Sequence, residues 1–293
     1  MTEPPLAGPG GVAGEIIPLR LPVPASIFQR RAARFRILAS GHAIGDYLAT
    51  LAALAEAQHL ACQEVSMSLD AHALSPTVPL RAPEWRRDEA WRRALALIVS
   101  EMGRAPLPDL ARAALVRLGE SDPAALETFA DAVLAGTFDP IDLAAAPFVG
   151  AALQAYWTVL AAGVSPENVE QSEHGCPMCG SPPVAGVVLG DDKLRYLVCS
   201  LCATAWHLIR VTCASCRATG GISYFSIQGD PGAVKAEACL QCHTYLKLFY
   251  LEQNPQAEPF ADDVATLSLD LLMSERGYAR GGVNPFFLPG LDS

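Results

Sequence analysis

Apolar residues in the first half of the chain recur at intervals of three and four, the spacing that places them on one face of a helix. Between Ser26 and Leu38, for example, Phe28, Arg31 and Phe35 share such a face. Helices are expected over residues 26–38, 44–65, 84–102, 106–118 and 121–134. With the segment that follows, residues 25–165 are predicted to form an all-α domain.

That next segment, Leu143 to Gly163, runs for 21 residues without a charged side chain. It is long enough to cross a bilayer as a helix. However, it consists mainly of Ala and Gly, contains Pro147 and Gly150, and has no Lys or Arg at either end to anchor it. We therefore expect a helix buried in the centre of a bundle and no membrane span.

The second half of the chain changes to short apolar stretches separated by turn residues, which is typical of strands. Strands are predicted over residues 183–189, 194–198, 222–227, 234–238 and 245–250. A helix is expected to begin at Asp262-Asp263 and to run to about Glu275, with its apolar face formed by Val264, Leu267, Leu271 and Leu272.

The overall pattern predicts an α+β fold, in which the N-terminal helical domain precedes two small cysteine-rich modules and a C-terminal helix. The predicted units are a flexible N-terminal arm (1–24), the helical domain (25–165), the first module (172–210), the second module (211–252), and a C-terminal helix with an irregular tail (253–293).

Eight of the nine cysteines lie in the two modules as Cys-x-x-Cys pairs. The pairs are Cys176/Cys179, Cys199/Cys202, Cys213/Cys216 and Cys239/Cys242. Such a turn aims two sulfur atoms at one point, and a tetrahedral metal ion needs two such turns. The sequence thus predicts two metal sites. Disulfide bonds are the competing use, but bonding cysteines three residues apart strains the turn.

The predicted strands indicate how the pairs combine. A hairpin between the first and second pairs would bring those two pairs together, and a hairpin between the third and fourth pairs would do the same for them. A cross-braced arrangement, in which the first and third pairs share one ion, stays open as an alternative. Only the first pair is followed by glycine, Gly180, the residue that best adopts a positive φ; Ala203, Arg217 and His243 stand at the other three positions.

Composition and charge narrow the functional classes. The 293 residues are 51% apolar, as in a globular protein, and the net charge is −10. Residues 171–293 hold 8 basic and 12 acidic side chains. Nucleic-acid binding draws its affinity from basic residues, so we expect no nucleic-acid partner. Dense thiols without a secretory pattern at the N-terminus favour a reducing compartment, the cytoplasm.

Few residues suggest catalysis. No Gly-x-Gly-x-x-Gly follows a predicted strand, and no pair is placed at a helix N-terminus, as thiol-disulfide exchange would favour. We therefore predict that the protein is not an enzyme. Cys62 is interpreted as a small buried apolar residue. His207 could be a fifth donor or a proton relay at the first site, although packing beside Trp206 is the simpler interpretation.

Several motifs resemble those of the FdhE family, the formate dehydrogenase formation or accessory proteins. They are Cys176-Pro-Met-Cys-Gly-Ser-Pro-Pro-Val-Ala185, Leu194-Arg-Tyr-Leu-Val-Cys-Ser-Leu-Cys-Ala-Thr-Ala-Trp-His207, Glu237-Ala-Cys-Leu-Gln-Cys-His-Thr-Tyr-Leu-Lys247, Asp262-Asp-Val-Ala265 and Asn284-Pro-Phe286. The resemblance implies a cytoplasmic factor that is required for active formate dehydrogenases and binds the catalytic subunit before its export. It also implies tandem rubredoxin-like iron sites with all eight paired cysteines as ligands. It does not identify any residue of this chain as catalytic.

Four thiolates suit iron and zinc equally well. Zinc would only hold the fold together, whereas iron could exchange single electrons. With iron, we expect the sites to sense or adjust the redox state of an immature formate dehydrogenase held against the helical domain. The alternatives are a four-cysteine zinc scaffold for protein contacts and a rubredoxin-type electron carrier.

Overall fold

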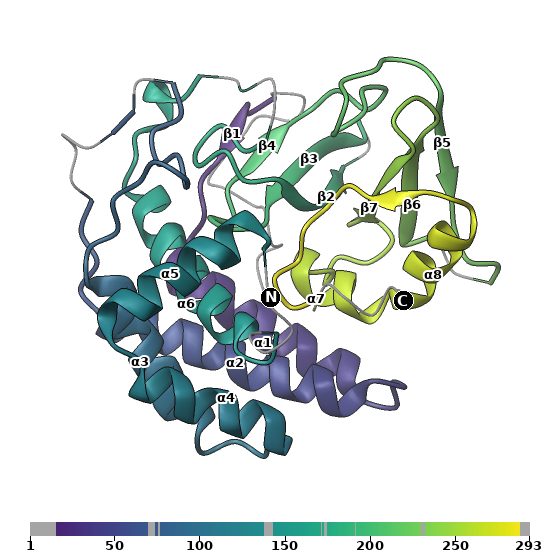
Figure 1. The fold of residues 1–293 in the computed structure, drawn as a ribbon. Helices are drawn as coiled ribbons and strands as arrows, with labels where there is room; N and C mark the ends of the chain where they lie inside the picture. Colours follow the sequence, from purple (N-terminus) through teal and green to yellow (C-terminus); the bar gives the residue numbers. More distant parts are fainter. Residues whose placement is uncertain are drawn as a thin grey trace.

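The computed structural model describes residues 16–69, 74–75, 77–137, 143–170, 172, 175–190, 192–229 and 232–287. A group of helices packs beside one mixed sheet, with α7 between them (Figure 1). The first fifteen residues of the predicted arm, the acidic residues before the uncharged segment and the last six residues of the tail lie outside the described parts.

The helical half contains six α-helices among the described residues. They are α1 (Pro24–Ala39), α2 (Gly45–Glu64), α3 (Ala90–Met102), α4 (Asp109–Glu120), α5 (Pro123–Ala135) and α6 (Ala146–Ala162). α1 and α2 pack along each other, and α6 contacts α1, α2, α3 and α5. Nearly all of α6 is buried, because its Ala and Gly residues let neighbouring helices approach closely. The prediction of a buried helix here is confirmed.

None of the described helices has both the length and the apolar character needed to cross a bilayer.

The predicted bounds of α1, α2, α4 and α5 agree with the structure to within three residues, but α3 begins six residues later than predicted. The Asp122 side chain caps α5 by accepting a hydrogen bond from the Ala125 amide, as the Ser-Asp-Pro signal indicates. In α3 the Asp88 carboxylate accepts from the Ala90 amide at 2.8 Å. Residues before Asp88 turn instead toward α6, where the Trp85 indole donates to the Tyr156 hydroxyl. The tertiary contact therefore overrides helix propensity.

In the described parts of the chain, eight strands form one sheet with the order β1-β4-β3-β2-β7-β6-β5, and β8 pairs with β7. The strands are β1 (Leu19–Arg20), β2 (Pro183–Leu189), β3 (Leu194–Cys199), β4 (Ala205–His207), β5 (Ile222–Phe225), β6 (Val234–Cys239), β7 (Thr244–Tyr250) and β8 (Ala279–Arg280). Part of the predicted N-terminal arm thus lies in the sheet, since β1 pairs with β4. The predicted strands at residues 183–250 are found close to their expected bounds.

A parallel pair, β2 and β7, joins the strands of the two predicted modules into this single sheet. Gly186 of β2 lies opposite Leu248 of β7 at the junction. A Cβ atom at Gly186 would lie 2.5 Å from Leu248 Cδ2, so a side chain there would force Leu248 to move. Glycine therefore allows the two antiparallel halves to meet side by side.

The predicted single C-terminal helix is wrong in its start and its continuity. It begins at Pro259, because the Glu258 carboxylate accepts from the amides of Phe260 and Ala261. It also breaks at Thr266 into α7 (Pro259–Ala265) and α8 (Leu267–Glu275).

The break has a tertiary cause. The Lys247 ammonium, on β7, donates to the carbonyls of Asp263 and Thr266, which a continuous helix would use internally. The predicted apolar face is also wrong at Leu271, which is exposed, whereas Leu269 and Met273 are buried.

One hydrophobic core extends from the helices into the sheet and includes the four cysteines of the first predicted site. Phe286 of the C-terminal tail packs into this core, with its ring near those of Phe35 and Phe260. Two arginines of α1 reach across the same boundary: Arg31 pairs with Glu258, and Arg34 pairs with Asp262. The helical half and the sheet are therefore held together by both packing and charge.

Candidate metal centres

The eight paired cysteines come together as two groups of four sulfur atoms. The first site comprises Cys176, Cys179, Cys199 and Cys202, and the second site comprises Cys213, Cys216, Cys239 and Cys242. Within each group all sulfur atoms lie within 4.8 Å of one another. The structure thus pairs first with second and third with fourth, as the hairpins predict, and does not form the cross-braced alternative.

The sulfur spacing suits a tetrahedral ion. The Sγ atoms of Cys176 and Cys202 are 3.6 Å apart, and those of Cys213 and Cys242 are 3.7 Å apart. A metal–sulfur distance of about 2.3 Å gives a tetrahedron with edges of about 3.8 Å. All nine cysteines are free thiols in the structure, so the disulfide alternative is not formed.

All four Cys-x-x-Cys turns share one backbone conformation. The residue after the second cysteine has a positive φ in every turn, namely 80° at Gly180, 57° at Ala203, 63° at Arg217 and 52° at His243. At Arg217 and His243, as at Gly180, the amide of this residue donates to the carbonyl of the first cysteine, which holds the less favourable conformation in place. The sequence departures from glycine therefore do not change the turn.

The turns also direct hydrogen-bond donors at the sulfur atoms. The amides of Met178, Leu201 and Ser215 donate to the sulfurs of Cys176, Cys199 and Cys213 at 3.3–3.4 Å. In the second turn of each site a threonine hydroxyl lies near the second sulfur: Thr204 at 3.2 Å from Cys202, and Thr244 at 3.0 Å from Cys242. The amide donors and the Thr244 hydroxyl stabilise thiolates, whereas at Thr204 the Cys202 thiol donates and the hydroxyl accepts. The Cys-x-Thr spacing, which occurs once in each site, is the sequence signal for these threonine contacts.

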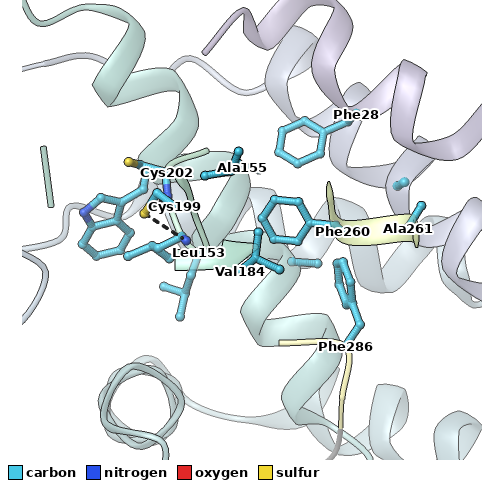
Figure 2. Close-up of a cluster of buried hydrophobic side chains, with 14 of the residues drawn as sticks. Phe28, Leu153, Ala155, Val184, Cys199, Cys202, Phe260, Ala261 and Phe286 are labelled. Atoms are coloured by element: carbon cyan, nitrogen blue, oxygen red, sulfur yellow. Dashed lines mark hydrogen bonds between the residues drawn. The ribbon is translucent and has the colours of Figure 1, made fainter. Parts of the chain in front are cut away.

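The first site is fully buried at the boundary between the helices and the sheet. All four of its cysteines are 0% exposed. Figure 2 shows Cys199 and Cys202 beside Leu153 of α6, near Val184 of β2.

Hydrogen bonds fix both turns of this site to the helical half. The amides of Leu80 and Ala82 donate to the carbonyls of Met178 and Cys179, and the Gln154 side chain donates to the Ser200 carbonyl at 2.6 Å. No local sequence pattern predicts these contacts, since residues 80–82 lie nearly a hundred positions before the first turn and Gln154 lies 46 positions before Ser200.

The second site is open to solvent on one side. Cys213 and Cys239 are buried, but Cys242 is only partly buried and Cys216 is exposed. The apolar side chain of Leu240, inside the fourth turn, is 53% exposed. The two sites therefore share a ligand set but differ in access.

The thiol pKa values differ within each site rather than between the two sites: the pKa of Cys199 is raised and that of Cys179 is lowered in the first site, and the pKa of Cys213 is raised to about 12 in the second. Burial raises the pKa of Cys176 well above its ordinary value. Burial also acts on Cys242, but hydrogen bonds from the Thr244 hydroxyl and amide outweigh it and lower the pKa to about 7. Four thiolates in so small a space repel one another, so a cation is needed to hold all of them deprotonated.

Two other sequence candidates lie outside these groups. The His207 ring packs edge-on against Tyr196, with the ring centres 5.6 Å apart, and is not part of either group. Cys62 is half-buried on α2, and burial raises the pKa of its thiol to about 12. Packing is therefore the simpler interpretation for both.

Comparison with known proteins gives matches along almost the whole chain. The family models described as FdhE N-terminal, FdhE central domain and FdhE C-terminal domain match residues 16–173, 175–210 and 211–287, respectively. The boundary between the last two models falls between the first and second sites. Each model after the N-terminal one therefore contains one four-cysteine group.

Individual relatives agree with the models. The chain is 42% identical over 277 residues to the Protein FdhE homolog of Serratia proteamaculans, covering 90% of this chain and 89% of the relative. It is 39% identical over 291 residues to that of Edwardsiella ictaluri, covering 96% and 94%. The crystal structure of the FdhE protein from Pseudomonas aeruginosa is similar, with a TM-score of 0.87 at 36% identity, over 94% of this chain and 100% of that one.

Proposed function

Because the chain belongs to the FdhE family, we propose that it is a maturation factor for formate dehydrogenase rather than an enzyme. In this role it binds the catalytic subunit in the cytoplasm. The observation that carries the proposal is the presence of two four-sulfur groups of equal geometry, one sealed in the core and one open to solvent. The open site would give a partner access to a metal ion, which a purely structural role does not require.

Each group holds one metal ion, with the eight cysteines as ligands in rubredoxin-like sites, and the ion is iron. The amide and hydroxyl donors around the sulfurs support a tetrathiolate metal site, because they stabilise its negative charge, and with iron they would also adjust its potential. Bound iron supplies one-electron exchange. The protein itself holds the thiolates, directs donors at them and leaves the Cys216 side uncovered.

The two sites have different roles in this proposal. The first site fixes the helical half to the sheet through the contacts of Met178, Cys179 and Ser200. The second site faces the formate dehydrogenase catalytic subunit, since Cys216 and Leu240 are exposed there. Electron exchange with an immature catalytic subunit requires such access, because buried sites are separated from a partner by intervening protein.

The test is complementation in a host that lacks its own copy of this factor. Cys213→Ser/Cys216→Ser is expected to remain folded, because this site lies outside the helical core, and to lose most formate dehydrogenase activation. Cys62→Ser is the matched control, since Cys62 belongs to neither site, and it should activate fully. Pull-down with the tagged chain measures binding of the catalytic subunit in parallel. A folded double variant with full activation would contradict the proposal.

A further inference from the structure

Arg195 is a fully buried arginine on β3, four residues before the first-site ligand Cys199, and its side chain is 0% exposed. Burying a guanidinium is costly unless its donors find acceptors. The identity of those acceptors therefore indicates what the residue holds in place.

Three of its acceptors are backbone carbonyls in the segment that connects the two sites. Nε donates to the Leu208 carbonyl at 3.2 Å, and Nη2 donates to the carbonyls of Ile209 and Thr212, both at 2.7 Å. Thr212 immediately precedes Cys213. Arg195 thus fixes the entrance to the first turn of the second site.

The remaining acceptor lies in the other half of that site. Nη1 donates to Oε1 of Glu237, which is 5% exposed and stands on β6, two residues before Cys239. The second carboxylate oxygen, Oε2, accepts from the Tyr224 hydroxyl at 3.1 Å. One guanidinium therefore contacts the approach to both Cys-x-x-Cys turns of the second site.

We propose that Arg195 is a positioning residue for the second site: it holds the Cys213 and Cys239 turns at the separation that a metal ion requires. The planar fork of arginine suits this task, because its donors reach Thr212 and Glu237 in fixed directions at once. This rests on the metal binding in the proposed function, but not on any role toward formate dehydrogenase. β3, which ends at the first-site ligand Cys199, thus also carries the residue that positions the second site.

The test measures metal affinity at each site in the full chain. Co²⁺ is titrated against a competing chelator, and the two sites are distinguished by variants that retain only one cysteine group. Arg195→Lys keeps the charge but removes the fork, and Arg36→Lys is the control, since Arg36 is an exposed arginine of α1 paired with Glu56.

Arg195→Lys should weaken the second site about 10- to 100-fold, the usual effect of losing a residue that orients metal ligands. The first site should change by less than about threefold, because Arg195 makes no contact with its ligands. Equal weakening of both sites would make Arg195 a general core residue and overturn the proposal, as would an unchanged second site.

A second variant keeps the proposal testable if Arg195→Lys does not fold. Glu237→Gln retains the carbonyl contacts of Arg195 and loses only the charged contact to β6, so it should weaken the second site selectively. Where Arg195→Lys does fold, adding Glu237→Gln to it should weaken the second site by less than about a further threefold, because both changes break the same link. An unchanged second-site affinity in Glu237→Gln, or fully additive effects in the double variant, would overturn the link between the two turns.

Discussion

At the scale of single residues, the position after each second cysteine is the most constrained one in the turns. Gly180, Ala203, Arg217 and His243 all have positive φ values. Only the first is a residue that adopts this conformation without cost. The turns therefore hold the same backbone shape whatever the residue, which indicates that the sulfur atoms and the turn's hydrogen bonds determine it.

Gly180→Ala tests this constraint. No atom would lie within 4 Å of the added Cβ, so the cost comes from the backbone alone and should be about 1–2 kcal/mol. Gly220→Ala is the matched control: its Cβ would also meet nothing, and its φ is not positive, so it should change stability by less than about 0.5 kcal/mol. The urea midpoint of the metal-saturated protein measures both. Equal shifts would contradict the backbone argument.

At the scale of elements, sequence patterns identified most of the structure because the relevant signals are local. The strands around the cysteines alternate with turn residues, and Asp122 caps α5 as its position indicates. One error, the start of the C-terminal helix, is a missed local cap at Glu258, and two others occur where a distant side chain intervenes. Lys247 of β7 breaks the C-terminal helix, and Tyr156 of α6 draws residues 85–88 out of α3. No local pattern contains that information.

The ion pair between α1 and α7 is a second feature that local patterns do not show. Arg34 donates two hydrogen bonds to Asp262, at 2.8 and 2.6 Å, and both side chains are nearly buried. Asp262 was predicted to cap a helix, but it lies inside α7 and joins the two halves of the molecule. Its neighbour Asp263 is fully buried and pairs with Lys247 and Arg280.

Arg34→Met should lower the free energy of unfolding by about 3–5 kcal/mol, because it leaves the buried Asp262 carboxylate without its partner. Arg36→Met, two positions along the same helix, removes an exposed pair in which the Arg36 and Glu56 side chains are 52% and 51% exposed. It should cost less than about 1 kcal/mol. Urea denaturation gives both values. A similar small loss in each variant would show that the α1–α7 pair does not stabilise the junction.

At the scale of the whole molecule, the helices and the sheet share one hydrophobic core, and the first site is part of it. The strands predicted between the cysteine pairs indicated which turns combine, because hairpins bring neighbouring pairs together, and the structure forms these groups. They could not predict that one site is sealed and the other open, since that depends on where α6 and residues 80–82 pack. The difference in exposure is therefore a finding of the structure.

This asymmetry predicts unequal consequences of losing each site. Cys176→Ser/Cys179→Ser should lower the melting temperature by at least about 5 °C, because the loss of a metal ion from a buried site removes folding energy from the shared core. Cys213→Ser/Cys216→Ser should have a clearly smaller effect on the helices. Thermal unfolding followed by the circular dichroism signal of the helices measures the melting temperature of both variants, with Cys62→Ser as the control. A larger effect on the melting temperature from loss of the second site would contradict the proposal that the first site fixes the helical half to the sheet.

The most direct test of the central claim is the metal content of the full chain purified without chelator, measured together with its visible spectrum. We predict two metal ions per chain, with the red colour of ferric tetrathiolate sites, and one ion per chain in either double-cysteine variant. Two colourless ions would retain the sites but replace iron with zinc. A folded protein that binds no metal, or that keeps two ions after one cysteine group is removed, would contradict the two-site account.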